Sequence, residues 1–264
     1  MKRVSLLLLS LISVLVANAW VSRGEEGIVI LATKYMTPQA KDLFESHLGP
    51  TYQDDIQCLY AAEKKGVATH SNEIHYVHLD KNLQPRNVEG DDALKAIEAA
   101  SEIIRAHNLH SKEEVVKALQ TVVNLMCDIH TLSHFRIEGV PHSQNDFGFY
   151  RRRRDYGEDM KEKVPLKWES LWGNHFGLRH KGFSPALYAE DMELCFGDKF
   201  VEYSQGTLRD WVVENGTKSA SYLAQFTPEC LISTLAYNEL DDVNYDMMAR
   251  ACFRLAALLN SLVK

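Results

Sequence analysis

Histidine and carboxylate side chains, which bind metal ions and transfer protons, concentrate in three segments of this sequence. These segments are residues 72–80 (NEIHYVHLD), 124–134 (NLMCDIHTLSH) and 168–175 (WESLWGNH). Side chains of these types are the usual protein ligands of zinc. A single histidine more often caps a helix or pairs with a surface carboxylate. On spacing alone, the three segments together support metal binding and that simpler interpretation equally.

The middle segment has the spacing of one helix face. Asn124 and Asp128 are four residues apart, and so are His130 and His134, so each pair lies on one side of a helix. His130 and His134 could therefore reach the same metal ion. Asp128 and His134 are separated by about a turn and two-thirds of helix. We expect these two residues to serve different metal ions or opposite sides of one pocket.

Most of the chain carries the signals of helices. Pro38 after threonine is typical of a first helical position, Ser111 opens a capping box, and Ser184 followed by proline marks another start. Residues 74–79 are the one convincing extended segment, and residues 139–164 form the one long irregular stretch. The periodicity predicts helices over residues 25–35, 38–48, 91–108, 112 to about 135, 185 onward, 207–214, 227–237 and 244–262. The sequence therefore predicts an all-α protein with a single domain.

The first nineteen residues have the pattern of a secretory signal peptide. A short basic start precedes an apolar run over residues 5–16, and residues 17–19 (Ala-Asn-Ala) fit the small-residue rule for cleavage. Cleavage after Ala19 would leave Trp20 as the first residue of a domain spanning residues 20–264. The apolar run is shorter than the roughly 20 residues of a membrane span, so a signal anchor fits less well. We expect a secreted or periplasmic protein without membrane attachment.

The composition is that of a globular protein and carries no overall positive charge for nucleic acid. Lys and Arg number 29 against 36 Asp and Glu, which gives a net charge of −7. Contact with nucleic acid therefore requires a local patch or a metal ion. The five cysteines of an exported chain allow one or two disulfides and leave at least one cysteine unpaired in a monomer. Cys127 lies in an apolar helical stretch and is expected to be a buried small side chain.

Four features occur in an order that resembles one known family. The predicted cleavage site directly precedes Trp20, and it is followed by YMTPQA at residues 35–40, HYVHLD at 75–80 and DIHTLSH at 128–134. This ordered set is similar to the S1/P1-type single-strand-specific nucleases, within the zinc-dependent phospholipase C superfamily. The similarity covers most of the chain after the signal peptide and weakens after about residue 177.

The resemblance implies an all-α fold that holds up to three zinc ions at the bottom of a cleft. In that family the α-amino group and carbonyl of the N-terminal Trp bind one zinc ion, and Trp20 matches this position. The metal ions activate the water that attacks phosphorus and stabilise the charge on the phosphoryl oxygens. The products carry 5′-phosphates, and 3′-mononucleotides can also be dephosphorylated.

The ligand positions implied by the resemblance are only partly kept. Four positions carry the ligand of the family, and Asp128 stands at the bridging one: Trp20, His75, Asp128 and His134. Two histidine positions carry a glutamate instead: Glu25 and Glu169. Three positions have lost a usable ligand: Ala62, Asn124 and Gly173. Four other residues could compensate only if the backbone has shifted: Glu63, His78, His130 and His175. Because zinc takes about four ligands, we expect at least one metal position to be lost, and the added oxygen donors favour harder ions such as manganese or calcium.

Basic and aromatic residues offer weaker signals of substrate binding. Lys65 matches a basic position near the scissile phosphate of the family, although a solvated lysine is the simpler interpretation. Residues 151–154 (RRRR) follow three aromatic residues at 147, 149 and 150. This combination suits a single-stranded nucleic acid, and packing of the loop explains it equally well. Asn215 begins a glycosylation sequon, Asn-Gly-Thr.

These observations predict a secreted hydrolase that cleaves phosphodiester bonds of single-stranded nucleic acid, with Asp128 as its central catalytic ligand. One alternative keeps the fold without catalysis and binds a nucleotide, another phosphate ligand or a partner protein in the same cleft. A phospholipase-like esterase fits less well, because nothing after the signal peptide suggests a lipid-facing surface. We expect a monomer whose partners are single-stranded nucleic acid or nucleotides.

Overall fold

The computed structural model of this chain describes residues 22–48, 72–140, 148–152, 163–173, 180, 182–225, 231–232 and 234–264. These residues are mostly helical and include two small β-sheets. The predicted predominance of helix is therefore confirmed. The proposed signal peptide, Trp20, Ala62 and Lys65 lie outside the described residues.

The described α-helices differ widely in length, from one turn to eight. They are α1 (Ser22–Lys34), α2 (Pro38–Leu48), α4 (Ala93–Arg105), α5 (Lys112–Asp128), α6 (Trp168–Gly173), α8 (Pro185–Phe196), α9 (Phe200–Tyr203), α10 (Leu208–Gln225) and α11 (Thr234–Leu262). Short 3₁₀ helices cover Asn72–His75 (η1), His107–Leu109 (η2) and Gly197–Lys199 (η4).

Several helices begin where the sequence predicted, because their first residues satisfy free backbone N–H groups. At the start of α5, the Ser111 hydroxyl accepts a hydrogen bond from the backbone N–H of Glu114 at 3.3 Å, and the Glu114 carboxylate accepts one from the N–H of Ser111 at 2.8 Å. Asp92 caps α4 in the same way through the N–H of Lys95. Ser184 caps α8 ahead of its proline. The capping box and the Ser-Pro start are therefore confirmed.

The strands form two separate sheets. β1 (Val77–Leu79) pairs in parallel with β2 (Phe135–Ile137). β3 (Gly148–Arg152) lies between β4 (Lys163–Lys167), its antiparallel partner, and β5 (Leu231–Ile232), its parallel partner.

Two sequence-based assignments are corrected by these strands. Residues 139–164 were expected to be irregular, but β3 and the start of β4 fall inside this range. Residues 227–237 were expected to be helical, but residues 231–232 form β5 and the helix begins only at Thr234. In both places strand pairing with a distant segment decides the structure, and local periodicity does not report such pairing.

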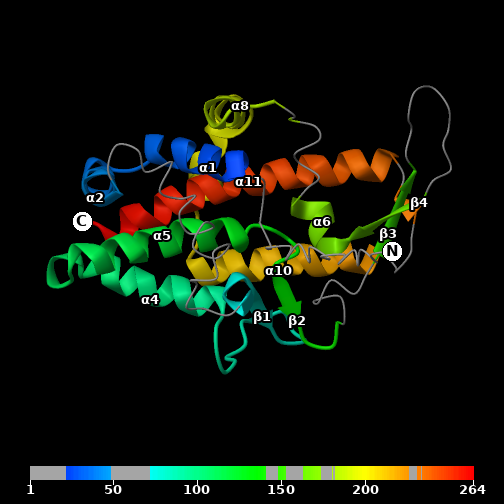
Figure 1. Ribbon diagram of the computed structural model, residues 1–264, viewed down its shortest axis with the longest axis horizontal. Helices are drawn as coiled ribbons and strands as arrows, with labels where there is room; N and C mark the ends of the chain where they lie inside the picture. The colour runs from blue at the N-terminus through cyan, green and yellow to red at the C-terminus, as the bar shows by residue number, and fades with distance from the viewer. Residues whose placement is uncertain are drawn as a thin grey trace, which may run out of the picture.

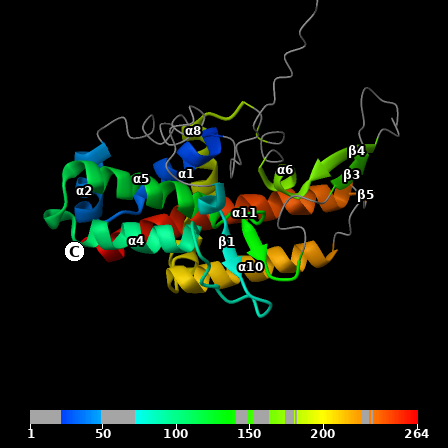
Figure 2. The same ribbon diagram turned by 60° about the horizontal axis from the view of Figure 1, so that its bottom comes forward.

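Helix α11 is the central element of the described core. It runs along much of the long axis of the molecule and contacts α1, α5 and α8 (Figure 1). Its residues 247–249 and 251–256 are all buried. Helices α4 and α5 lie side by side at the end that carries the C-terminus, and α10 lies along α11 on the side of β1 and β2 (Figures 1 and 2).

Two glycines allow elements to approach closely. A Cβ atom on Gly27 of α1 would lie 2.6 Å from the Cβ of Tyr188 of α8. A Cβ atom on Gly216 of α10 would lie 2.3 Å from Cδ1 of Leu79 in β1. Both distances are far below van der Waals contact. The packing of α1 on α8 and of α10 on β1 therefore requires glycine, which has no Cβ, at these two positions.

The three described cysteines carry free thiols: Cys127, Cys195 and Cys252. Cys127 is buried, as predicted, and burial raises the pKa of its thiol well above the usual value. Cys58 and Cys230, on which a disulfide would depend, lie outside the described residues. None of the described helices has the length and apolar character of a membrane span.

Candidate functional site

The turn between α5 and β2 brings Asp128 and His134 together. Helix α5 was expected to continue to about residue 135, but it ends at Asp128. The chain then reverses in tight turns, with hydrogen bonds from the N–H of Thr131 to the carbonyl of Asp128 and from the N–H of His134 to the carbonyl of Thr131, both at 2.9 Å. The predicted helical pairing of His130 with His134 is therefore wrong. Asp128 and His134 lie 3.0 Å apart because of this turn, whereas a continuous helix would separate them.

Asp128 lies between two imidazole rings at the centre of the site. Its Oδ2 accepts a hydrogen bond from Nδ1 of His75 at 2.7 Å, and its Oδ1 lies 3.0 Å from Nδ1 of His134. Asp128 and His134 are fully buried, and His75 is 3% exposed. His75 ends η1 directly before β1, and the N–H of Val77 donates to the carbonyl of His134 at 2.9 Å. The parallel pairing of β1 with β2 therefore fixes both histidines beside the carboxylate.

The charge on Asp128 is maintained by its neighbours. Burial would raise the pKa of this carboxyl, but the rings of His75 and His134 outweigh burial and lower the pKa. Several buried atoms here have no hydrogen-bond partner in the described structure: Oδ1 of Asp128 and both ring nitrogens of His134. The 3.0 Å contact between these residues lacks the alignment of a hydrogen bond, and unsatisfied buried polar atoms of this kind are rare in proteins.

Glu169 reaches the site through Tyr76. The Tyr76 hydroxyl donates to Oε1 of Glu169 at 3.3 Å, and the Tyr76 ring lies 5.2 Å from the His134 ring, centroid to centroid. The guanidinium of Arg136 stacks on the Tyr76 ring at 3.5 Å. Burial and the charge of Glu169 raise the pKa of Tyr76 far above its usual value, so this hydroxyl keeps its proton. Glu169 is thus near the site but does not touch Asp128 in any described contact.

Glu25 and Asn124 are buried on the helices α1 and α5. Glu25 lies on α1 and is 2% exposed, and its charge helps to raise the pKa of Cys127, the residue before Asp128. Asn124 is buried on α5, one turn before Asp128. Gly173 is the last residue of α6. Three predicted positions, Trp20, Ala62 and Lys65, lie outside the described residues, as do Glu63 and His175.

Two of the histidines that could have compensated for a lost ligand, His78 and His130, bond to groups other than Asp128. Nδ1 of His78 lies 2.9 Å from Oδ2 of Asp92, and its Nε2 lies 3.4 Å from Glu73. His130 is fully buried and donates from Nδ1 to the carbonyl of Met126 at 2.7 Å. Neither residue therefore replaces a lost ligand in this structure. Within the described residues, no set of three or more His, Cys, Asp or Glu side chains is arranged to hold a metal ion.

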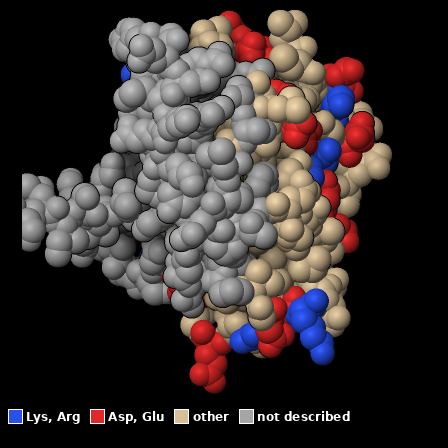
Figure 3. Space-filling model, turned by 90° about the vertical axis from the view of Figure 1, so that its right-hand side faces the viewer, with Lys and Arg blue, Asp and Glu red and all other residues tan. Residues whose placement is uncertain are grey.

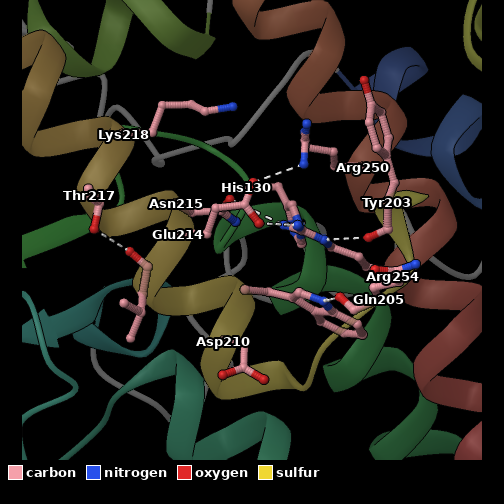
Figure 4. Close-up of polar contacts among 12 residues, drawn as sticks. His130, Tyr203, Gln205, Asp210, Glu214, Asn215, Thr217, Lys218, Arg250 and Arg254 are labelled. Atoms are coloured by element: carbon pink, nitrogen blue, oxygen red, sulfur yellow. Dashed lines mark hydrogen bonds and ion pairs between the residues drawn. The ribbon is translucent and has the colours of Figure 1, made fainter. Parts of the chain in front are cut away.

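A buried polar network, which sequence analysis missed, lies on the other side of the α5–β2 turn. Its centre is Arg254 of α11, which is 2% exposed and extends toward α10 and His130 (Figure 4). Nη1 of Arg254 donates to Nε2 of His130 and to Oδ1 of Asn215, both at 3.3 Å, and Nε donates to the carbonyl of Tyr203 at 3.0 Å. Nη2 donates to Glu214. An arginine surrounded by apolar residues in α11 was the available signal, because a buried guanidinium needs several acceptors.

The network accounts for two features of the sequence. Burial and the positive charge of Arg254 lower the pKa of His130 well below the usual value, so the ring stays neutral. Asn215 is fully buried and donates from Nδ2 to the carbonyl of Ile129 at 2.8 Å. The sequon that Asn215 begins is therefore closed to glycosylation in this folded structure.

Charges of both signs are interspersed on the described part of the face shown in Figure 3, without a basic patch among the described side chains there. The basic run at residues 151–154 lies only partly within the structure: Arg151 and Arg152 belong to β3.

No family model matches the chain, and no curated protein matches it closely enough to count as a relative.

Proposed function

We propose that this protein is an exported, metal-dependent hydrolase of phosphodiester bonds in single-stranded nucleic acid, with the fold of the S1/P1-type nucleases. The observation that carries this proposal is the buried Asp128 between His75 and His134. Its Oδ1 and the His134 ring nitrogens lack hydrogen-bond partners in the described structure. A divalent cation would satisfy Oδ1 of Asp128 and one ring nitrogen of His134, since carboxylate and imidazole are its common protein ligands.

Asp128, His75 and His134 would hold the metal ions, and the resemblance to the S1/P1-type family gives Asp128 the bridging position. His75 lies against Oδ2 and His134 against Oδ1, so each oxygen is paired with its own imidazole. The further ligands would come from the amino group and carbonyl of Trp20, from Glu25 and Glu169, and from water. A bound divalent ion supplies a Lewis acid and lowers the pKa of a water molecule.

The residues of this chain contribute position and charge to the reaction. His75 donates Nδ1–H to Asp128, which leaves Nε2 as the ring atom with the lone pair and fixes the orientation of the ring. The Tyr76 hydroxyl remains a proton donor and holds Glu169. Lys65 would place a positive charge near the scissile phosphate, and the products would carry 5′-phosphates, with 3′-nucleotides as further substrates.

The test uses exported protein whose first residue is confirmed as Trp20. We expect two or three bound zinc or manganese ions by mass spectrometry and degradation of single-stranded DNA or RNA that a chelator stops. Asp128→Asn keeps the shape of the side chain, so it should abolish cleavage and metal binding while the protein still folds. Wild-type protein that leaves single strands intact with zinc or manganese present would contradict the proposal.

The second candidate is a protein with the same fold that binds a nucleotide or phosphate ligand without cleaving it. The described residues favour it in one respect: they contain no set of three ligating side chains arranged around a metal ion. In this case the protein would carry one metal ion or none. Mononucleotide binding would then survive the chelator, and calorimetry with and without the chelator separates the two functions.

A further inference from the structure

Two buried side chains of α10 donate hydrogen bonds to the backbone of the α5–β2 turn. The carbonyl of Ile129 accepts from Nδ2 of Asn215 at 2.8 Å, and the carbonyl of Leu132 accepts from the hydroxyl of Ser219 at 2.6 Å. Asn215 and Ser219 are four residues apart, so both project from one face of α10. All residues from 129 to 134 are buried. Water therefore does not replace these two bonds without opening the core.

Arg254 determines which way the Asn215 amide faces. Its Nη1 can only donate, so the atom of Asn215 that it meets must be the carbonyl oxygen Oδ1. The amide nitrogen is thereby directed to the carbonyl of Ile129. The same Nη1 donates to Nε2 of His130, which leaves the proton of that ring on Nδ1, where it bonds to Met126. One guanidinium therefore orients two side chains that hold the turn.

The remaining contacts of Arg254 fix its own position. Its Nε donates to the carbonyl of Tyr203, and its Nη2 pairs with Glu214, which Arg250 also contacts at 2.8 Å. The close approach of α10 to β1 at Gly216 places Asn215 and Ser219 within reach of the turn. Helices α10 and α11 and the turn are thus joined at a single buried point.

We propose that Arg254 is a positioning residue for the Asp128 site: through Asn215 and His130 it sets the α5–β2 turn so that His134 faces Asp128. Arg254 touches neither Asp128 nor His134 in any described contact. It acts on the backbone that connects them. The metal-binding part of this inference rests on the proposed function, whereas the orientation of the His134 ring does not.

The test compares Arg254→Lys with Arg250→Lys in the exported protein. Lysine keeps the charge next to Glu214 but cannot donate to Asn215, His130 and Tyr203 at once. Arg250 lies one turn earlier on α11, shares Glu214, and its described hydrogen bonds go to Asp246 and Glu214 and not to Asn215 or His130. It is therefore a matched control for the loss of an arginine from this helix.

The primary measurement is the long-range ¹H–¹⁵N spectrum of the histidine rings without metal. We expect Arg254→Lys to move the signals of both His130 and His134, and Arg250→Lys to leave them near their wild-type positions. A change at His130 alone, with His134 unmoved, would overturn the proposal, because it would show a purely local role. The same holds if the two lysine variants have equal effects.

Two further measurements keep the test decisive. Asn215→Ala removes the side chain through which Arg254 would act on the turn, so it should move the His134 signal even if Arg254→Lys fails to fold. Zinc affinity, measured by competition with a chromophoric chelator, should fall about tenfold in Arg254→Lys and stay unchanged in Arg250→Lys. If the wild-type protein binds no zinc, the proposed function fails, and the ring signals alone decide the positioning role.

Discussion

The two sides of the α5–β2 turn show opposite ways of burying polar groups. On one side, Oδ1 of Asp128 and both ring nitrogens of His134 lack hydrogen-bond partners in the described structure. On the other side, every nitrogen of the Arg254 guanidinium has an acceptor, and both ring nitrogens of His130 are engaged. Unsatisfied buried atoms cost stability, and the proposed function assigns a metal ion to this side of the turn. The satisfied network indicates a structural role.

His130 and His134 are four residues apart, and both are fully buried. Helical spacing alone would place both side chains on the same face. Their roles differ because the turn sends one ring toward α11 and the other toward Asp128. The difference teaches that the hydrogen bonds available to each ring nitrogen distinguish a structural histidine from a candidate ligand. Each of the following predictions tests this contrast.

The largest expected effect is on stability, from Arg254→Met. Removal of the guanidinium leaves Oδ1 of Asn215, Nε2 of His130 and the carbonyl of Tyr203 without their donor in the core. We expect a loss of about 3–5 kcal/mol in the free energy of unfolding, measured by chemical denaturation. Arg209→Met is the control, because Arg209 forms an exposed ion pair with Glu98 and its loss should change stability little. Equal losses in the two variants would show that the network is not structural.

Gly216→Ala tests the contact that brings α10 against β1. The new methyl group would lie 2.3 Å from Cδ1 of the buried Leu79, so α10 or the Leu79 side chain must move. We expect a loss of about 1–3 kcal/mol, again from denaturation. Thr217→Ala changes the next, exposed residue of α10 and should be nearly neutral. If Gly216→Ala left the free energy of unfolding unchanged, α10 would not be in close contact with β1.

The two histidines are compared directly by His134→Gln and His130→Gln. The glutamine amide carries both a donating nitrogen and an accepting oxygen, so it can replace the neutral His130 between Met126 and Arg254. It is a poor substitute for an imidazole ligand. We expect zinc affinity to fall about tenfold or more in His134→Gln, which corresponds to about 1.4 kcal/mol, and to stay near the wild-type value in His130→Gln. Calorimetric titration with zinc measures the affinity of each variant. A larger loss in His130→Gln than in His134→Gln would contradict the assignment of His134 as the metal ligand.

The smallest effect concerns pH and the outer part of the network. Burial would raise the pKa of Asp246, but hydrogen bonds from Tyr203 and Arg250 and the charges of Arg250 and Lys218 outweigh burial and lower the pKa. The charged form therefore adds stability above the usual pKa of about 3.9, and this contribution is lost as the pH falls through the lowered value.

Asp246→Asn should accordingly flatten the decline of stability toward acid pH, measured by denaturation between about pH 6 and pH 2. The exposed Asp198→Asn serves as the control and should leave the curve unchanged. An Asp246→Asn protein with the acid decline of the wild type would show that this carboxylate contributes nothing there.

Local sequence signals predicted the starts of helices well. Ser111 with Glu114, Ser184 before proline and Thr37 before Pro38 satisfy backbone groups within their own first turn, so no distant residue is needed. The end of α5 was not predictable in this way. The apolar pattern continues past Asp128, and the helix stops there because β2 pairs with β1 and α10 holds the turn.

For the candidate site, too, residue identities were predictable from the sequence and the geometry was not. His75, Asp128 and His134 were identified from the sequence, because their residue types and order are informative without a structure. Their geometry was not, since a straight helix would have kept Asp128 and His134 apart. Arg254 was missed entirely, because its partners Asn215 and His130 are 39 and 124 residues away in the chain.

By itself, the sequence determined that this protein is mostly helical, where several of its helices begin, and which residues could bind a metal ion. These properties depend on neighbours within about one helical turn. Only the tertiary structure decided how His134 comes to face Asp128 while His130 faces Arg254, where α5 ends and what holds the turn between them. Those outcomes depend on hydrogen bonds that buried groups must find in distant segments, because a buried polar group without a partner is costly.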